Sequence, residues 1–146
     1  MTAPKHITIA SAPEGFDAKL ILDEVAKSGP VAHIARDDKR LAAMQAALAF
    51  FAPDMPVFVF PAWDCLPYDR VSPNADISAA RMATLAGLVH GMPERFVMLT
   101  TMAAATQRVP ARHVPRDAAF KARVGDRSDE KGLRTSLVPM AFPPTP

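Results

Sequence analysis

Cysteine, tryptophan and tyrosine each occur only once in the 146 residues, as Cys65, Trp63 and Tyr68. A single cysteine excludes a disulfide framework and a cysteine-rich zinc site, and it is typical of a reducing compartment. No uninterrupted apolar run approaches the roughly 20 residues that a membrane span requires, and the first residues contain no apolar signal core. The sequence therefore predicts a cytoplasmic protein that does not enter a membrane.

The chain also has little excess charge of either sign. Its net charge of +2 is too small to indicate nucleic-acid binding by the whole chain. Residues 1–90 sum to −2 and residues 91–146 to +4. The basic side chains concentrate between Arg108 and Arg134, where they form either a docking surface or a solvated face. The candidates for a docking surface are Arg108, Arg112, Arg116, Lys121, Arg123 and Arg127.

Short apolar runs alternate with longer helical patterns along the first 110 residues. The runs predict strands at 5–10, 31–35, 57–60 and 95–100, and the patterns predict helices at 16–27, from Asp37 or Asp38 to before Pro53, from about 73 to 90, and at 101–108. This alternation indicates an α/β fold with an open, mostly parallel sheet. Right-handed crossovers would then place helices on both faces of that sheet.

The character of the sequence changes near residue 110. Pro110 and Pro115 lead into a segment with a helical pattern over 128–138, which Pro139 interrupts. Four prolines in the last eight positions leave the end of the chain unable to remain regular. We therefore predict an α/β domain over residues 1–110, followed over 111–146 by a linker and the truncated start of another subdomain.

The turn after the first predicted strand lacks the chemistry of a phosphate loop. Residues 10–19 read ASAPEGFDAK, with one glycine, no Gly-Lys-Ser/Thr and two carboxylates, Glu14 and Asp17. A phosphate loop needs glycines that wrap backbone N–H groups around the phosphates and a lysine that reaches them. We therefore expect no ATP site and no cofactor, because the two carboxylates would repel phosphates.

No other pattern specifies a reaction. His6, His33, His90 and His113 have no ligand-like spacing, so no metal site is expected. His33 falls in a predicted buried strand and is interpreted as a core histidine. Cys65 has no glycine-rich elbow and is interpreted as a small loop residue.

The loop after the third predicted strand is the most distinctive part of the sequence. It places Trp63 and Tyr68 among Pro61, Pro67 and Pro73. The loop follows the carboxyl end of a strand, which is where open α/β sheets place their sites. The alternative is that the two aromatic side chains merely pack the loop onto the sheet edge, while the prolines stiffen it.

Arg81 is unusual because it lies on the apolar stripe of the helix that follows this loop. The stripe consists of Ile77, Met82, Leu85, Leu88 and Val89. A guanidinium that faces a core should be paired. Asp64, Asp69 and Asp76 are the candidate partners, and such a bond would fix the loop to the helix.

The same stretch resembles the N-terminal region of the bacterial transcription-repair coupling factor family. The residues that carry the resemblance, and that form a candidate signature loop and scaffold, are Trp63, Leu66, Pro67, Tyr68, Asp69, Ser72, Pro73, Asp76 and Arg81. Further matches are APEG at 12–15, ARDD at 35–38, TQRVP at 106–110 and VGDR at 124–127, so the resemblance spans essentially the whole chain.

The resemblance implies a UvrB-like module whose first subdomain has a degenerate helicase (RecA-like) fold without ATPase motifs. In the family, the second subdomain recruits the excision-repair ATPase UvrA, while later domains contact RNA polymerase and move along DNA. The docking residues for UvrA would lie beyond Pro146, so only a scaffold role is expected here, without catalytic residues. The alternative is a stand-alone nucleic-acid- or nucleotide-binding domain of helicase descent that uses the loop and residues 108–134.

Overall fold

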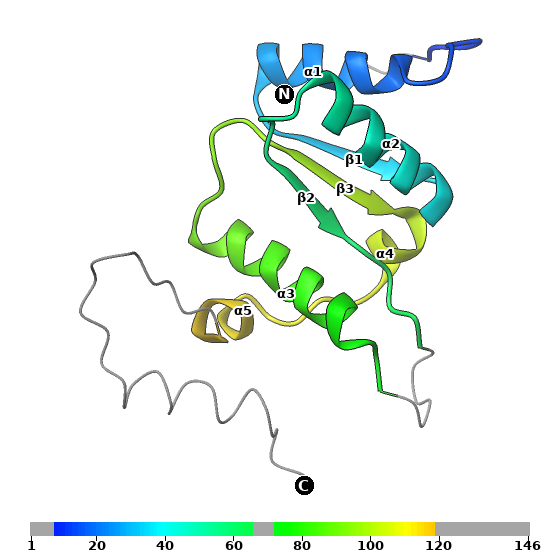
Figure 1. The fold of residues 1–146 in the computed structure, drawn as a ribbon. Coiled ribbons are helices and arrows are strands. Elements are labelled where there is room, and N and C mark those ends of the chain that lie inside the picture. Colours follow the sequence, from blue (N-terminus) through cyan, green and yellow to red (C-terminus); the bar gives the residue numbers. More distant parts are fainter. Residues whose placement is uncertain (1–7, 66–71, 119–146) are drawn as a thin grey trace, which may run out of the picture. The chain divides into compact units, whose positions relative to one another are not determined.

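The computed structural model describes residues 8–65 and 72–118, which form helices and parallel strands in alternation (Figure 1). In chain order, the elements are α1 (Phe16–Ser28), β1 (Val31–Ala35), α2 (Asp38–Phe51), β2 (Val57–Phe60), α3 (Ala75–His90), β3 (Val97–Thr101), α4 (Met102–Thr106) and α5 (His113–Ala118). The described residues divide into two compact units. The sheet unit takes in residues 8–62 and 93–105, and the helical unit takes in 63–65, 72–92 and 106–118.

The sheet unit is built on three parallel strands in the order β1-β3-β2. The last strand in the chain is thus the central one, with Val97 opposite both Val31 of β1 and Val57 of β2. Its residues Val97 and Leu99 are completely buried. Burial does not alternate along β3, as is usual for central strands of parallel sheets. The open parallel sheet predicted from the sequence is confirmed.

Helices α1 and α2 cover one face of this sheet and form its core. The two helices contact each other, α1 contacts β1, and α2 contacts β1 and β3 (Figure 1). The buried cluster consists of Ala18, Val25, Ala35, Leu41, Met44, Leu48, Val97 and Leu99. A second helical layer on the opposite face, which the crossover rule predicts, stays a prediction, as does the domain boundary near residue 110.

Local signals in the sequence place the ends of the helices. The carboxylate of Asp37 accepts the N–H of Arg40 at 2.8 Å and caps α2, and the side chain of Asn74 accepts the N–H of Asp76 at 2.8 Å and caps α3. Gly29 ends α1 at a φ of 90° and donates its N–H to the carbonyl of Val25 at 3.1 Å. The strands predicted at 31–35 and 57–60 are confirmed with unchanged bounds.

Other sequence predictions differ from the structure. Residues 8–10 of the strand predicted at 5–10 are not in a strand, and Ile9 is 53% exposed, so this short run gains no burial from pairing; residues 5–7 lie outside the described part. The strand predicted at 95–100 begins at Val97 and extends to Thr101. The helix predicted at 101–108 ends at Thr106. The helical pattern at 128–138 also lies outside the described residues.

Two apolar side chains near the ends of their helices are on the surface, and one of them, Leu88, was predicted to lie on the apolar stripe of its helix. Phe51 is 53% exposed at the last position of α2, where its ring lies edge-on to that of Phe50 with centroids 5.2 Å apart. Leu88 is 50% exposed in the last turn of α3. Both lie at the C-terminal end of their helix, beyond the turns that are buried. No helix in the described residues is long and apolar enough to span a membrane.

Candidate functional site

Within the helical unit, the side chain of Gln107 connects Trp63 with Arg81. The oxygen Oε1 of Gln107 accepts the backbone N–H of Trp63 at 2.9 Å. The same oxygen accepts Nη1 of Arg81 at 3.1 Å. The Cζ atom of Arg81 also lies 4.4 Å from the centroid of the Trp63 ring. A single oxygen of Gln107, the residue after α4, therefore binds both the backbone of Trp63 and the side chain of Arg81 on α3.

Arg81 is the most deeply buried polar residue of this arrangement. Its side chain is 1% exposed, and the only other buried residue of α3 is Thr84, one turn further on. Burial lowers the pKa of Arg81 from its usual value, although a guanidinium stays charged at neutral pH. A buried cation is tolerated where polar atoms and an aromatic face replace its water. Gln107 and Trp63 supply both kinds of contact.

The predicted burial of Arg81 is confirmed, while the partners found differ from those expected. The carboxylate of Asp64 accepts the backbone N–H of Asn74, with its two oxygens at 3.2 and 3.4 Å. Asp76 is exposed in the first turn of α3. Asp69, the third predicted partner, lies outside the described residues, so an Arg81–carboxylate bond stays a prediction. Gln107 was missed because no helical or strand spacing relates it to Arg81.

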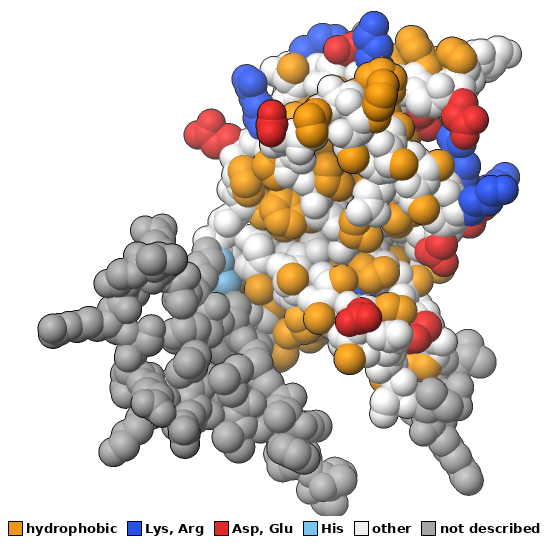
Figure 2. Space-filling model, viewed as in Figure 1, with side chains coloured by type: hydrophobic (Ala, Val, Ile, Leu, Met, Phe, Trp, Pro, Cys, Tyr) orange, Lys and Arg blue, Asp and Glu red, His pale blue; other side chains and the backbone are white. Residues whose placement is uncertain are grey.

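The remaining candidate residues divide into exposed and undescribed ones. Ser72 and Pro73 are exposed on the approach to α3, and Arg108 and Arg112 are exposed after α4. The predicted site residues outside the described part are Leu66, Pro67, Tyr68, Asp69, Lys121, Arg123 and Arg127, together with the side chain of Arg116. On the face shown in Figure 2, Lys and Arg side chains are interspersed with Asp and Glu, so the described part of that face carries no patch of one sign.

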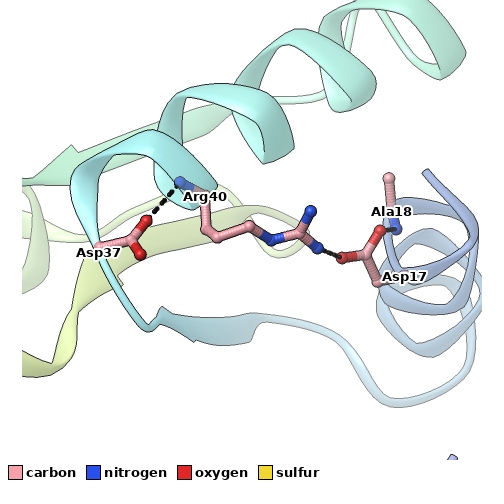
Figure 3. Close-up of polar contacts among 4 residues, drawn as sticks. All are labelled: Asp17, Ala18, Asp37 and Arg40. Atoms are coloured by element: carbon pink, nitrogen blue, oxygen red, sulfur yellow. Dashed lines mark hydrogen bonds and ion pairs between the residues drawn. The ribbon is translucent and has the colours of Figure 1, made fainter. Parts of the chain in front are cut away.

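A second arrangement, which sequence reasoning missed, lies in the sheet unit at the carboxyl end of β1. It is a hollow of about 210 Å³, lined by Asp17, His33, Ile34, Ala35, Arg36 and Arg40. An oxygen of Asp17 lies 3.1 Å from Nη2 of Arg40, so the side chains of the first turns of α1 and α2 point toward each other (Figure 3). The available signal in the sequence was that Asp17 and Arg40 lie in the first turns of two successive helices, with opposite charges.

The charges around this hollow are paired with each other. Arg36 lies 3.0 Å from the carboxylate of Asp37. The N–H of Arg40 and the side chain of Arg36, which both donate to Asp37, lower the pKa of that carboxyl. Each of the two arginines that line the hollow, Arg36 and Arg40, is therefore paired with an aspartate.

His33 lines the hollow, so its interpretation as a core histidine is only partly right. It is half-buried on the strand at the edge of the sheet. Burial lowers the pKa of His33, Asp17 raises it, and Arg40 lowers it, with burial as the largest effect. Among the described residues, no group of three His, Cys, Asp or Glu side chains is arranged to hold a metal ion.

We predict that Arg81→Met lowers the free energy of unfolding by about 2 kcal/mol, because it removes a charged hydrogen bond and a cation–π contact. Arg95→Met is the control, since Arg95 is exposed. Unfolding by urea measures the free energy. The fluorescence of Trp63, the only tryptophan, should shift in the folded Arg81→Met protein and not in the control. Equal effects of the two variants on stability and emission would contradict the assignment.

We predict that His33 makes the folded state less stable as the pH falls below about 6.5. The unfolded chain takes up a proton at the usual histidine pKa, whereas the folded chain takes it up only at a lower pH. His33→Gln should therefore flatten the dependence of Tm on pH between 7 and 5. His113→Gln, at an exposed position, should leave that slope unchanged. Parallel slopes for wild type and His33→Gln would refute the prediction.

The comparisons with known proteins give one relative and no family model, since none matches the chain. The chain is similar to the transcription-repair-coupling factor of Escherichia coli (strain K12), with 30% identity over 127 residues. The match covers 84% of this chain and 11% of that protein, so the chain spans about a tenth of the length of this relative. The similarity supports in part the resemblance found in the sequence.

Proposed function

We propose that this chain is a non-catalytic scaffold module of a transcription-repair coupling factor, corresponding to its N-terminal, UvrB-like region. The similarity over 84% of the chain is the observation that carries the proposal. In the complete protein, the module would serve the recruitment of nucleotide excision repair, in the cytoplasm, to stalled RNA polymerase. Contacts with RNA polymerase and DNA would belong to other domains, and the UvrA-docking residues would lie beyond Pro146.

The carboxyl edge of the sheet supports a role without nucleotide chemistry. In an active helicase-type domain, this edge holds the nucleotide phosphates on glycine N–H groups and a lysine. Residues 10–19 carry Glu14 and Asp17 in place of that lysine motif. Arg40, which could attract a phosphate, is bonded to Asp17 instead.

The contacts of Arg81 support a scaffold role for the signature loop. A charged side chain that is 1% exposed cannot contact a partner directly, so its effect is to hold Trp63 and Gln107 in place. Such an arrangement fixes the shape of a surface rather than creating a reactive group. The rival function, stand-alone nucleic-acid binding, depends on the basic residues at 108–134, most of which lie outside the described part.

The proposal predicts that this chain replaces the matching stretch of its E. coli relative. A chimera of that protein, in which the aligned stretch is exchanged for this chain, should co-migrate with purified UvrA on a sizing column. The same protein with the stretch deleted should not, because the neighbouring docking subdomain would lose its support. The 146-residue chain alone should also migrate separately from UvrA.

A folded chimera that fails to bind UvrA, beside an unaltered relative that binds, would contradict the proposed function. Binding by the isolated chain would instead show that a docking surface lies within residues 1–146. The exposed Arg108 and Arg112 would then be the first residues to exchange, with Arg95 as the matched control.

A further inference from the structure

The hollow at the carboxyl end of β1 is lined by basic side chains that could bind an anion, and by the carboxylate of Asp17, which offsets their charge. Parallel α/β sheets bind their ligands outside the carboxyl ends of the strands. A space of about 210 Å³ has room for a tetrahedral oxyanion, since a water molecule takes up about 30 Å³ in the liquid. Its lining includes three nitrogen-bearing side chains, His33, Arg36 and Arg40, against the single carboxylate of Asp17.

Asp17 makes the contacts that an oxyanion would make in this place. Its Oδ2 lies 3.1 Å from Nη2 of Arg40, and its Oδ1 accepts the N–H of Ala18 at 3.0 Å (Figure 3). Phosphates in proteins are commonly held by just these two groups, a guanidinium and the first N–H groups of a helix. Ala18 itself is completely buried, so its N–H has no access to bulk water.

The Asp17–Arg40 pair is too exposed for its main effect to be stability. The side chains are 36% and 46% exposed, and exposed ion pairs contribute little to folding. The pair has a larger effect on the charge of the hollow. The carboxylate of Asp17 offsets the positive charge of Arg40, which is the arginine of α2. Arg36 is engaged in the same way by Asp37.

We propose that the Asp17 carboxylate is a built-in occupant of this hollow, which keeps phosphate-like oxyanions out and which, once its charge is removed, leaves a working phosphate site. The occupant is a side chain of the protein itself, so the wild type binds no phosphate there. This inference goes beyond the proposed function, although both draw on the ion pair between Asp17 and Arg40.

The test is thermal unfolding of Asp17→Asn in inorganic phosphate at pH 7, against sodium chloride of equal ionic strength. Asparagine keeps the size of the side chain and removes its charge, which weakens its bond to Arg40 and so makes the guanidinium more available to a charged ligand. We expect about 50 mM phosphate to raise Tm by about 3 °C more in this variant than in wild type, because a ligand that binds only the folded state stabilises it. Adding Arg40→Gln should abolish the extra shift.

Asp23→Asn is the matched control, since it removes the same charge from an exposed position of the same helix. The control is needed because phosphate also stabilises proteins by strengthening apolar burial in general. If Asp17→Asn fails to fold, Asp17→Ser provides a second uncharged variant, with a shorter side chain. A folded Asp17 variant whose phosphate response equals that of Asp23→Asn, or survives Arg40→Gln, would overturn the proposal.

Glu14 offers a further check on the same inference. Its side chain lines an adjoining hollow of about 100 Å³, which shares Asp17 and Arg40 with the first. If carboxylates exclude phosphate here, Asp17→Asn with Glu14→Gln should respond to phosphate at least as strongly as Asp17→Asn alone. A weaker response of the double variant would contradict exclusion by charge.

Discussion

The position of β3 between β1 and β2 is the constraint on which the rest of the described structure depends. All three strands are parallel, so each return to the sheet needs a long crossover. The central strand comes last in the chain, and the sheet is therefore completed only after the excursion of residues 61–96. That excursion contains Trp63 and Arg81, the two residues around which the helical unit is organised. The same parallel order brings the carboxyl ends of the strands to one edge, where Asp17 and Arg40 meet.

The contacts of Arg81 in the helical unit are directional, whereas the core of the sheet unit is held by apolar packing. In the sheet unit, Leu48, Val97 and Leu99 are stabilised by removal from water and need no particular direction of contact. A guanidinium needs hydrogen-bond acceptors at fixed angles, and its stacking on Trp63 adds a further restriction. These contacts of Arg81 therefore fix the relative positions of Trp63 and Gln107. This property suits a module whose proposed role is to present a surface to other proteins.

Much of the sheet unit could be predicted from the sequence, because its signals are local. The apolar runs at 31–35 and 57–60 are bounded by glycine or proline, and Asp37 is a strong cap at the start of a helix. The first predicted strand shows the limit of this reasoning, since a strand-like stretch of six residues, KHITIA, does not by itself determine whether a partner strand is available. Residues 8–10 have strand-like composition and no strand.

The candidate sites were harder to predict, because they join residues that no periodicity relates. Arg81 was identifiable as a charge on an apolar stripe. Its bond to Gln107 spans 26 positions of the sequence, and the elements β3 and α4 lie between them in the chain. Asp17 was predicted to be unfavourable for phosphate, which stays a prediction, and its bond to Arg40 was not foreseen because it exists only where α1 and α2 pack together. Sequence reasoning thus identified which residues were unusual and could not identify what they contact.

The most direct test of a module without nucleotide chemistry is the thermal unfolding of the wild-type chain in increasing MgATP. The account predicts a Tm that does not change up to millimolar concentrations, because the carboxylates at the start of α1 repel phosphates and Arg40 is already bonded. A saturable rise of several degrees would mean that the folded chain binds the nucleotide. That result would contradict both the scaffold function and the occupied state of the hollow.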